Sequence, residues 1–594
     1  SSAATSFTDN TVVAGTTYRY AVIHRDLAYN YSAALVGVIT SSPSITSTTT
    51  GGLWSVGSTW VGGVAPTSSS DVIIDSGATV TLDAAVTRND GFNTTVRTGA
   101  TLATAGFNYT NNNSNTNSTK VNGTFKFDGG SVTGYDFVYD GINSTLVLNT
   151  AVTFSGTEKY WPSSNSPNNI NVLSGGLTMN AARTVAGVFQ TATGVTLNTI
   201  LTLNGTCQIN SGGYFDNGSP TYGSSSLLQY NSTGIYNRSL EWTSDIATIG
   251  TTPGYPNNVQ ISNSTTLNYY RASNTGPKGM NGNLIIDAGS SLSYGAITTG
   301  GALSVKGNVT NAGNISLGTA AVGDDLKVGG NYTNTGAGTF TGNNRAIWFV
   351  NFTSPIVPIT QIVTSATALT IPFVVTSGGT AGTTVQLASD VIISSSPTGA
   401  NVISFGASGA DVIDINGRNL TIGATNSIGT IGGTGTFKGS ATSNLTILGS
   451  TASTIGTLSF TSGFQNLGTF TMNRQPSVVG CVLGTPLTVN TSLALTNGHV
   501  DLGTNNLTLA SGASIGGTPG SASFVIADDT GGQLTRTLSA SGTYTYPIGD
   551  NSGTTEYTPA TLTFTGGTYA GTVGVRVIDA IHPSNVGATN YLTR

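Results

Sequence analysis

Residues 193–213, TGVTLNTILTLNGTCQINSGG, decide the fold class of this chain. Short runs of alternating apolar and polar residues follow one another in this stretch, and Asn or Gly residues separate them. Such alternation places the apolar side chains on one face of an extended strand, and Asn-Gly or Gly-Gly pairs favour turns. The stretch therefore predicts several β-strands of about three to five residues, each followed by a turn.

The same pattern returns along most of the chain at irregular spacing, as in TGATLATAGF (98–107), SGGLTMNAARTV (174–185), NGRNLTIG (416–423) and NGHVDLGTNNLTLASGASIGG (497–517). Strands this short cannot bury a face in a two-sheet sandwich, but coils that stack on one another share one continuous core. We therefore predict a right-handed parallel β-helix over residues 51–519, with about 20 coils stacked ~4.8 Å apart. The predicted inward positions include Val80, Leu82, Leu201, Leu203, Leu507 and Leu509. Asparagines before glycine, namely Asn204, Asn416 and Asn497, are expected to adopt left-handed conformations or to form amide ladders between coils.

The composition agrees with strands and excludes several other classes of protein. Only 8% of the residues are charged, and three Glu and seven Lys are too few for amphipathic helices. Abundant Ser, Gly and Asn can also indicate disorder, but 37% of the residues are hydrophobic and they recur periodically. A net charge of −5 gives no basic surface for nucleic acid, and no apolar run reaches the length of about 18 residues that spans a membrane. We therefore expect neither a nucleic-acid partner nor a membrane span.

The first 50 residues lack the repeated pattern. Residues 7–36 alternate apolar and polar positions, with Tyr18, Tyr20 and Val22 on one face, and predict a hairpin. The pattern from Gly15 to Val22 resembles the closing strands of a fibronectin type III sandwich. The resemblance implies that residues 1–40 are the C-terminal part of such a domain. The polar stretch at 41–50 is expected to be a linker, and both ends of the sequence suggest a piece of a longer protein without a visible signal peptide.

Two further segments carry specific motifs. The first is residues 51–86, with Trp54 and Trp60, a turn from Gly62 to Pro66, and two strand-like runs at 71–74 and 77–82. It resembles the opening of β-helical modules in large secreted, adhesin-like proteins of Bacteroidota. The second is residues 520–594, with Tyr546 to Asp550 and His582-Pro583. It resembles the module that often follows the β-helix in those proteins. The resemblance implies export by type IX secretion and display outside the cell, on its surface. We expect a terminal antiparallel β module at 520–594, so that β-sandwich-like modules flank the β-helix.

Trp54 and Trp60 have two possible roles. An aromatic pair can cover the open end of an apolar stack, which a solenoid must cap. The same pair could instead form a platform on which sugars stack. We favour the structural cap because both tryptophans stand beside turn residues at the start of the repeat.

Residues that carry chemistry are few and scattered. The closest acid pairs are Asp71 with Asp75, Asp136 with Asp140, Asp324 with Asp325, Asp411 with Asp414, and Asp528 with Asp529. None has the i, i+2 spacing that places two carboxylates on one face of a strand, although acids on neighbouring coils could still meet. His24, His499 and His582 are far apart in the sequence, and Cys207 and Cys481 are expected to be buried rather than disulfide-bonded. We therefore predict no catalytic residues, no metal site and no cofactor.

Six tyrosines between residues 130 and 240 are candidates for stacking on sugars: Tyr135, Tyr139, Tyr214, Tyr222, Tyr230 and Tyr236. The alternative is that they pack under loops. Taken together, the sequence predicts a non-catalytic surface protein that serves as a structural stalk, adhesin or filament segment. Expected partners are glycans of the cell surface or the environment, further copies of itself, or other surface proteins. A β-helical protein that binds or degrades polysaccharides is the alternative.

Overall fold

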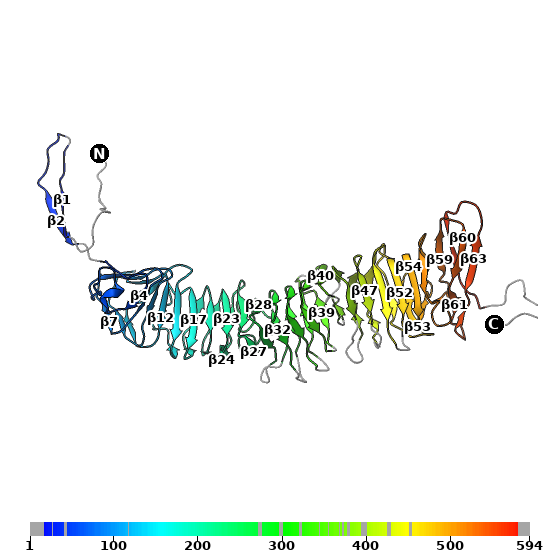
Figure 1. Cartoon of the computed structure of the whole chain (residues 1–594), viewed down its shortest axis with the longest axis horizontal. Helices are drawn as coiled ribbons and strands as arrows, with labels where there is room; N and C mark the ends of the chain where they lie inside the picture. The colour runs from blue at the N-terminus through cyan, green and yellow to red at the C-terminus, as the bar shows by residue number, and fades with distance from the viewer. Residues whose placement is uncertain are drawn as a thin grey trace, which may run out of the picture. The chain divides into compact units, whose positions relative to one another are not determined.

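The structure, a computed structural model, is β throughout apart from one 3₁₀ turn, η1 (Gly57–Thr59), within the residues that it describes (Figure 1). Strands pair in parallel from one turn of the chain to the next and form a β-solenoid of about 19 turns. The predicted all-β parallel β-helix is thus confirmed. The described residues are 17–26, 28–40, 44–116, 118–270, 276–295, 301–319, 323–343, 345–354, 356–367, 369–370, 373–376, 381–393, 401–423, 429–450 and 454–579.

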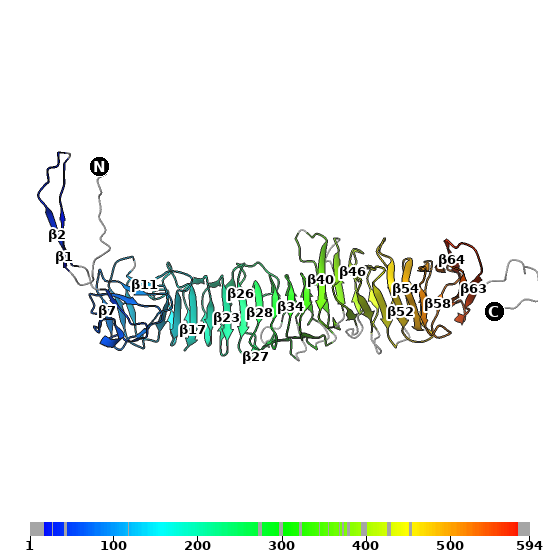
Figure 2. The same ribbon diagram turned by 45° about the horizontal axis from the view of Figure 1, so that its top comes forward.

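The chain divides into two compact units. Unit 1 comprises Ser1–Leu228 and Ser239–Glu241, and unit 2 comprises Gln229–Arg238 and Trp242–Arg594. Within each unit, strands of successive coils lie side by side in parallel sheets (Figure 2). Each coil therefore finds its hydrogen-bond partners in its neighbours, as in other solenoids.

One coil of unit 1 shows how residues 193–213 fold. Its strands β21 (Gly194–Leu197), β22 (Leu201–Leu203) and β23 (Thr206–Asn210) lie in three different sheets. In every strand the apolar side chains are buried and the residues between them are partly exposed. All three strands pair with the preceding coil at an offset of 18 residues: Val195 with Leu177, Leu201 with Arg183, and Cys207 with Phe189.

Five parallel sheets build the solenoid of unit 1. The long sheet contains β4 (Gly51–Leu53), β6 (Thr79–Thr81), β9 (Thr101–Ala103), β12 (Thr124–Phe127), β15 (Thr145–Asn149), β17 (Asn169–Ser174), β20 (Phe189–Thr191) and β23. Beside the first coils stand β3 (Ser44–Thr46), β5 (Asp71–Ile74), β8 (Thr94–Val96), β11 (Thr119–Val121) and β14 (Val138–Tyr139), and a third sheet of β7 (Val86–Arg88), β10 (Tyr109–Asn111) and β13 (Val132–Gly134). Later coils contribute β16 (Val152–Phe154), β18 (Leu177–Met179), β21 and β24 (Tyr214–Asp216), and then β19 (Arg183–Val185), β22 and β25 (Thr221–Tyr222).

Unit 2 is built in the same way. Its long sheet contains β28 (Asn258–Ile261), β31 (Leu284–Ile286), β34 (Val309–Asn311), β37 (Tyr332–Asn334), β40 (Ile359–Ser365), β43 (Thr383–Leu387), β46 (Val412–Asp414) and β49 (Thr436–Lys438). A second sheet contains β27 (Gly234–Asn237), β29 (Thr265–Asn268), β32 (Ser291–Ser293), β35 (Asn314–Ser316) and β38 (Thr339–Thr341). A third contains β30 (Lys278–Met280), β33 (Leu303–Val305), β36 (Leu326–Val328), β39 (Ile347–Val350), β42 (Phe373–Thr376), β45 (Ile403–Ser404) and β48 (Ile431–Gly432).

Two more sheets hold the last coils of unit 2. One contains β41 (Leu369–Thr370), β44 (Val391–Ile393), β47 (Asn419–Ile422), β50 (Asn444–Leu448), β52 (Asn466–Asn473), β54 (Leu487–Asn497), β56 (Leu507–Leu509) and β59 (Leu534–Leu538), with β57 (Ser514–Gly517) beside β54. The other contains β51 (Thr457–Leu458), β53 (Val479–Leu483), β55 (His499–Asp501), β58 (Val525–Ile526) and β61 (Ile548–Asp550).

Glycines in the turns between strands allow close packing of neighbouring coils as well as unusual backbone angles. A Cβ atom on Gly205 would lie 2.1 Å from the backbone oxygen of Gly187, its counterpart in the preceding coil. The Asn204-Gly205 turn therefore needs a close approach of two backbones. Asn416 adopts the expected left-handed backbone conformation, with a φ of 51°. Asn497 instead forms the other predicted feature, an amide ladder, because its Nδ2 donates to Asn473 Oδ1 at 2.9 Å.

The solenoid begins earlier than the sequence predicts. We expected residues 41–50 to be a linker, but β3 within that stretch pairs in parallel with β5. The next residue, Ser47, is buried, and its Oγ accepts a hydrogen bond from the backbone of Asp75 at 2.9 Å. Polar residues can join the stack because strand pairing uses backbone groups and does not require apolar side chains. The linker prediction is therefore wrong for residues 44–50.

The solenoid also ends later than predicted. The predicted boundary at 519/520 falls inside the stack, because β59 pairs in parallel with β56, and β61 pairs in parallel with β58. In the described residues, the antiparallel strand pairing that we expected from residue 520 occurs in three later pairs of strands. They are β60 (Gly542–Tyr546) with β63 (Ala560–Phe564), β62 (Glu556–Tyr557) on β61, and β64 (Gly571–Val575) on β59.

The described part of the first 40 residues is one antiparallel hairpin. β1 (Thr17–Val22) pairs with β2 (Leu35–Thr40), and the rings of Tyr18 and Tyr20 stack with centroids 6.2 Å apart. A hairpin is what the alternation in residues 7–36 predicts. Residues 1–16, and residues 580–594 with the His582-Pro583 motif, lie outside the described residues.

Candidate functional site

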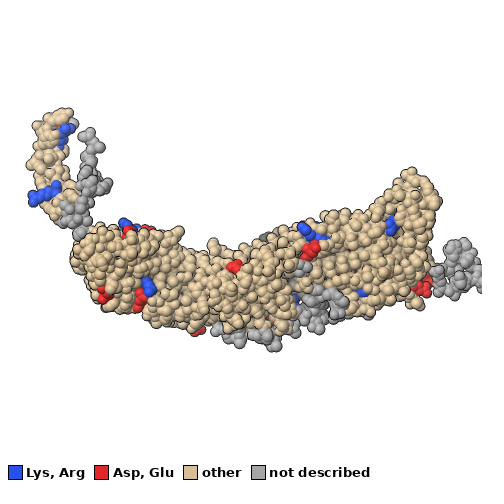
Figure 3. Space-filling model, in the orientation of Figure 1, with Lys and Arg blue, Asp and Glu red and all other residues tan. Residues whose placement is uncertain are grey.

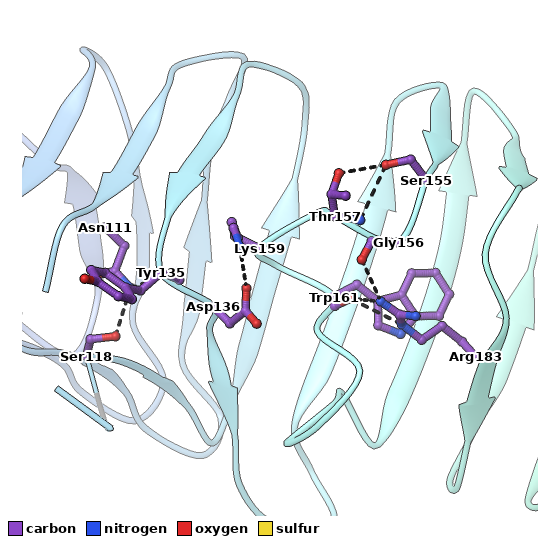
Figure 4. Close-up of polar contacts among 10 residues, drawn as sticks. All are labelled: Asn111, Ser118, Tyr135, Asp136, Ser155, Gly156, Thr157, Lys159, Trp161 and Arg183. Carbon is purple, nitrogen blue, oxygen red and sulfur yellow. Dashed lines mark hydrogen bonds and ion pairs between the residues drawn. The ribbon is translucent and has the colours of Figure 1, made fainter. Parts of the chain in front are cut away.

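An irregular segment, residues 155–168, interrupts the regular coils of unit 1. It follows β16 and occupies the place of a strand between β14 and β19. The backbone N–H of Phe137 donates to the carbonyl oxygen of Lys159, and that of Tyr139 donates to Asn165. On its other side, the guanidinium of Arg183 donates to the carbonyl oxygen of Trp161 at 2.9 Å (Figure 4). The segment is thus fixed to the coil before it and to the coil after it.

Aromatic side chains anchor this segment to the core. Tyr160 and Trp161 are buried. The ring centroid of Tyr160 lies 4.5 Å from that of Phe127, and the ring centroid of Trp161 lies 4.6 Å from that of Phe154. The guanidinium of Arg183 lies over the ring of Phe154, 4.6 Å from its centre. Burial lowers the pKa of Arg183, although Glu158 and Asp136 act in the opposite direction. The coil is therefore filled by aromatic side chains where the strand is missing.

A first hollow lies on one side of segment 155–168. Its volume is about 410 Å³, and it is lined by Ser114, Asn115, Thr116, Ser118, Gly134, Tyr135, Asp136 and Lys159. Tyr135 is 51% exposed, so its ring is open to a ligand. Lys159 Nζ and the carboxylate of Asp136 form an ion pair at 3.0 Å, and both side chains are accessible (Figure 4). The hollow thus combines an aromatic ring with charged, hydroxyl and amide groups.

A second hollow lies on the other side of the segment. Its volume is about 240 Å³, and it is lined by Ser163, Ser166, Ala182, Arg183, Thr184, Ile200 and Thr202. The Oγ of Ser166 is buried and has no hydrogen-bond partner among the described residues. Because a buried hydroxyl is costly without a partner, Ser166 carries an unused hydrogen-bonding group just beneath this surface.

Glu158 fixes the start of segment 155–168. Its carboxylate accepts hydrogen bonds from the backbone of Ser155 and Gly156 and from the hydroxyl of Ser155, between 2.8 and 3.1 Å. Burial would raise the pKa of Glu158, but these hydrogen bonds outweigh it and lower that pKa. Glu158 is therefore ionised at neutral pH.

A third hollow lies on the sheet formed by β16, β18, β21 and β24, and its volume is about 290 Å³. Thr153, Thr178 and Thr196 stand in register along it. The ring of Tyr214 lies so close to Gly194 that a Cβ atom there would meet it at 2.7 Å. The hollow is a shallow surface with a row of threonine hydroxyls and one tyrosine.

Of the six tyrosines proposed to stack on sugars, two are exposed, namely Tyr135 and Tyr214. The prediction is wrong for the other four, which are between 0% and 8% exposed: Tyr139, Tyr222, Tyr230 and Tyr236. The hydroxyl of Tyr139 donates to the carbonyl oxygen of Tyr160 at 2.8 Å, and that of Tyr222 donates to Glu241 at 2.9 Å. These rings occupy inward strand positions, so the alternative of packing within the core holds for them.

Trp54 and Trp60 lie together in the first coil of unit 1. Both are buried, their rings meet edge to face with centroids 5.3 Å apart, and Trp60 Nε1 donates to the carbonyl oxygen of Trp54 at 2.8 Å. β3 and β4 of this coil pair with β5 and β6 of the next coil. The buried pair thus has the position that a cap requires, and its ring faces are not open to a sugar.

Most acids singled out in the sequence serve local structure. Arg97 pairs with Asp75 at 2.7 Å, and Lys120 pairs with Asp140 at 2.8 Å. Asp325 forms a buried ion pair with Arg345 at 2.8 Å. Four others accept backbone hydrogen bonds within turns or between coils, namely Asp71, Asp411, Asp414 and Asp528.

The two cysteines, possible metal sites and possible membrane-spanning helices remain to be considered. Cys207 and Cys481 are free and buried, and burial raises the pKa of both thiols. Across the described residues, no three His, Cys, Asp or Glu side chains stand close enough to hold a metal ion. No helix in the same residues has the length and apolar character needed to cross a bilayer.

The sequence analysis missed Lys159, Ser166 and Arg183 as residues of the two hollows. Asp136 was singled out only as a possible partner of Asp140. A signal for Lys159 and Ser166 exists in TEKYWPSSNSPNN at 157–169, where the alternation stops and two charged residues stand together in a chain that has few. Comparison of the chain with protein-family models, curated proteins and solved structures finds no significant match.

Proposed function

We propose that this protein is a non-catalytic stalk displayed on the outside of a bacterial cell, where it extends or adheres. The observation that carries the proposal is the parallel register, which is kept from coil to coil in each unit. In unit 1, Leu102, Phe125 and Leu146 occupy the same inward position of consecutive coils. Every added coil lengthens such a stack without changing its cross-section.

The distribution of charge on the surface also supports an extracellular location. The charged residues on the visible face stand in a few small groups, and wide uncharged areas separate them (Figure 3). Several of the cations in unit 1 are paired with acids, as in Lys120 with Asp140 and Lys126 with Asp128. The motifs at 51–86 and 540–583 resemble those of secreted surface proteins of Bacteroidota and support the proposed location.

A test uses the bacterium that makes the protein. Antibodies against the chain should label intact cells as strongly as permeabilised cells, and deletion of the gene should reduce attachment of the cells to surfaces under flow. Complementation with Leu267→Asp should fail, because it places a charge in the core of unit 2. Thr266→Asp, on the outward side of the same strand, should restore attachment. Labelling restricted to permeabilised cells, or full attachment without the gene, would exclude a surface stalk.

Glycan binding is the second candidate function, and the exposed ring of Tyr135 favours it. Aromatic rings that are open to solvent beside hydrogen-bonding groups suit the alternating apolar and polar faces of a sugar. Polysaccharide cleavage has less support, because most of the acids singled out above are engaged in ion pairs or turns.

A further inference from the structure

We propose that unit 1 binds an uncharged polysaccharide built of pyranose sugars, across the two hollows that flank segment 155–168. Tyr135 is the stacking platform of this site, and Ser166 is a hydrogen-bonding group in the second hollow. The proposal deepens the glycan-binding candidate and rests on it, and it is independent of the stalk function. Four observations carry it.

The first is that the exposed ring of Tyr135 is held in place by its backbone. The N–H of Tyr135 donates to the carbonyl oxygen of Asn111 at 2.8 Å, and its carbonyl oxygen accepts from Asn111 Nδ2 at 3.2 Å. The preceding residue, Gly134, has a φ of 92° and lies so close to Asn111 that a Cβ would meet its oxygen at 2.0 Å. An exposed ring with a fixed backbone loses little entropy when a ligand stacks on it.

The second is the set of polar groups around this ring. The carboxylate of Asp136 accepts hydrogen bonds, and the ammonium of Lys159 donates them. These side chains remain 56% and 36% exposed while they form their ion pair at 3.0 Å. A pair of neighbouring sugar hydroxyls needs both an acceptor and a donor, which the two residues offer side by side.

The third is the unused hydroxyl of Ser166 in the second hollow. Its Oγ is buried and has no partner in the part of the chain that the structure describes, and the half-buried residue itself lines the hollow together with Thr184 and Thr202. A ligand hydroxyl that reaches Ser166 would satisfy a group that is otherwise buried at a cost. Segment 155–168 contributes Lys159 to the first hollow and Ser166 to the second, so one extended chain can reach both.

The fourth is the charge balance, which selects the class of polysaccharide. Two acids, Asp136 and Glu158, and two bases, Lys159 and Arg183, stand along this surface, so their charges cancel. Arg183 is already bound to the carbonyl oxygens of Trp161, Gly156 and Ala182. An anionic polysaccharide would therefore gain no net electrostatic attraction from this surface. An uncharged polysaccharide does not depend on such attraction.

Affinity electrophoresis of the full chain in native gels tests the proposal. The uncharged probes are barley β-glucan, hydroxyethylcellulose, laminarin and xylan, and the anionic probes are alginate and polygalacturonate. We expect at least one uncharged polysaccharide to retard the protein, and the anionic ones not to retard it. Tyr135→Ala should weaken the retardation about tenfold, and Tyr135→Phe should keep it within about twofold, because stacking needs the ring and not its hydroxyl.

Ser166→Ala separates a binding role from a structural one. The substitution removes a buried hydroxyl that lacks a partner, so the melting temperature should stay the same or rise. Binding should nevertheless weaken about threefold to tenfold. Tyr214→Ala, at the exposed tyrosine of the third hollow, is the matched control and should bind like the parent protein.

Three results would overturn the proposal. They are the absence of retardation by every uncharged probe, retardation by the anionic probes only, and equal retardation of the parent protein and Tyr135→Ala. Loss of binding in Tyr214→Ala but not in Tyr135→Ala would also place the site elsewhere. None of these results bears on the stalk function, which is tested by surface labelling and attachment.

Discussion

The side-chain oxygen of Asn283 accepts a hydrogen bond from the backbone N–H of Asn308 at 2.8 Å, across two neighbouring coils of unit 2. The same contact recurs above and below it. Asn283 donates to Asn258, Asn331 donates to Asn308, and Ile362 donates to Asn331, at 2.7 to 2.9 Å. A ladder of asparagines therefore ties five coils together outside the core.

Truncation of one asparagine of this ladder should lower the stability of unit 2. Asn308→Ala leaves the N–H of Asn331 without its acceptor and should reduce the free energy of unfolding by about 1 kcal/mol. Asn308→Asp keeps an acceptor and should lose less. Urea denaturation followed by circular dichroism measures both, and Asn551→Ala, at an exposed asparagine outside the ladder, is the control. Equal stability of Asn308→Ala and the parent protein would show that water replaces the ladder.

Acid should destabilise unit 2 through His499. Its side chain is buried against Phe524, with ring centroids 4.0 Å apart, and burial lowers its pKa from 6.5 to about 4. As the pH falls below 6.5, the unfolded chain binds a proton that the folded protein does not bind until about pH 4. The neutral His499 therefore costs no stability above pH 6.5. Between pH 6.5 and pH 4 the free energy of unfolding should fall, by at most about 3 kcal/mol.

Urea midpoints measured from pH 7 to pH 4 test this assignment. His499→Leu should flatten the profile over that range, whereas His24→Leu, on the exposed hairpin, should leave it unchanged. A His499→Leu profile as steep as that of the parent protein would assign the acid sensitivity to other groups.

Gly205 should not tolerate a side chain. Gly205→Ala places a Cβ 2.1 Å from the backbone oxygen of Gly187, and neither backbone can move without disturbing its coil. We expect a loss of about 1–3 kcal/mol in the stability of unit 1. Gly520→Ala meets no atom within 4 Å and should cost far less. The two variants are compared by thermal unfolding, and similar melting temperatures would contradict the close approach.

The two thiols should report the opening of each unit separately. Cys207 belongs to unit 1 and Cys481 to unit 2, and both are fully buried. Because burial also raises both pKa values, neither thiol should react with dithionitrobenzoate at pH 8 until its unit unfolds. Labelling of Cys207→Ala and Cys481→Ala at rising urea concentration measures the two openings. Rapid labelling of either variant without urea would show that its coil is open in the native protein.

Local alternation was enough to predict the fold and its core. The six inward positions named from the sequence are buried, with exposures of 0% to 1%: Val80, Leu82, Leu201, Leu203, Leu507 and Leu509. The same alternation also indicates that some of the tyrosines proposed to stack on sugars point into the core. Tyr230 stands two residues after Leu228 in one strand and must share its inward face. Tyr135 follows a corner glycine, where alternation no longer applies.

The hollows could not be predicted in the same way. Lys159 and Asp136 stand 23 residues apart, and they meet because segment 155–168 takes the place of a strand. This path depends on buried contacts such as that of Trp161 with Phe154. Boundaries failed for a related reason, since backbone pairing admits polar strands such as β3 that carry no apolar pattern.

The constant offset between β18 and β21, β19 and β22, and β20 and β23 has an evolutionary consequence. Because all three strands recur after the same number of residues, an in-frame duplication of that stretch would keep the parallel strand pairing between the two copies. Selection could thus adjust the reach of such a molecule through simple recombination within its own gene, with no need for new core residues.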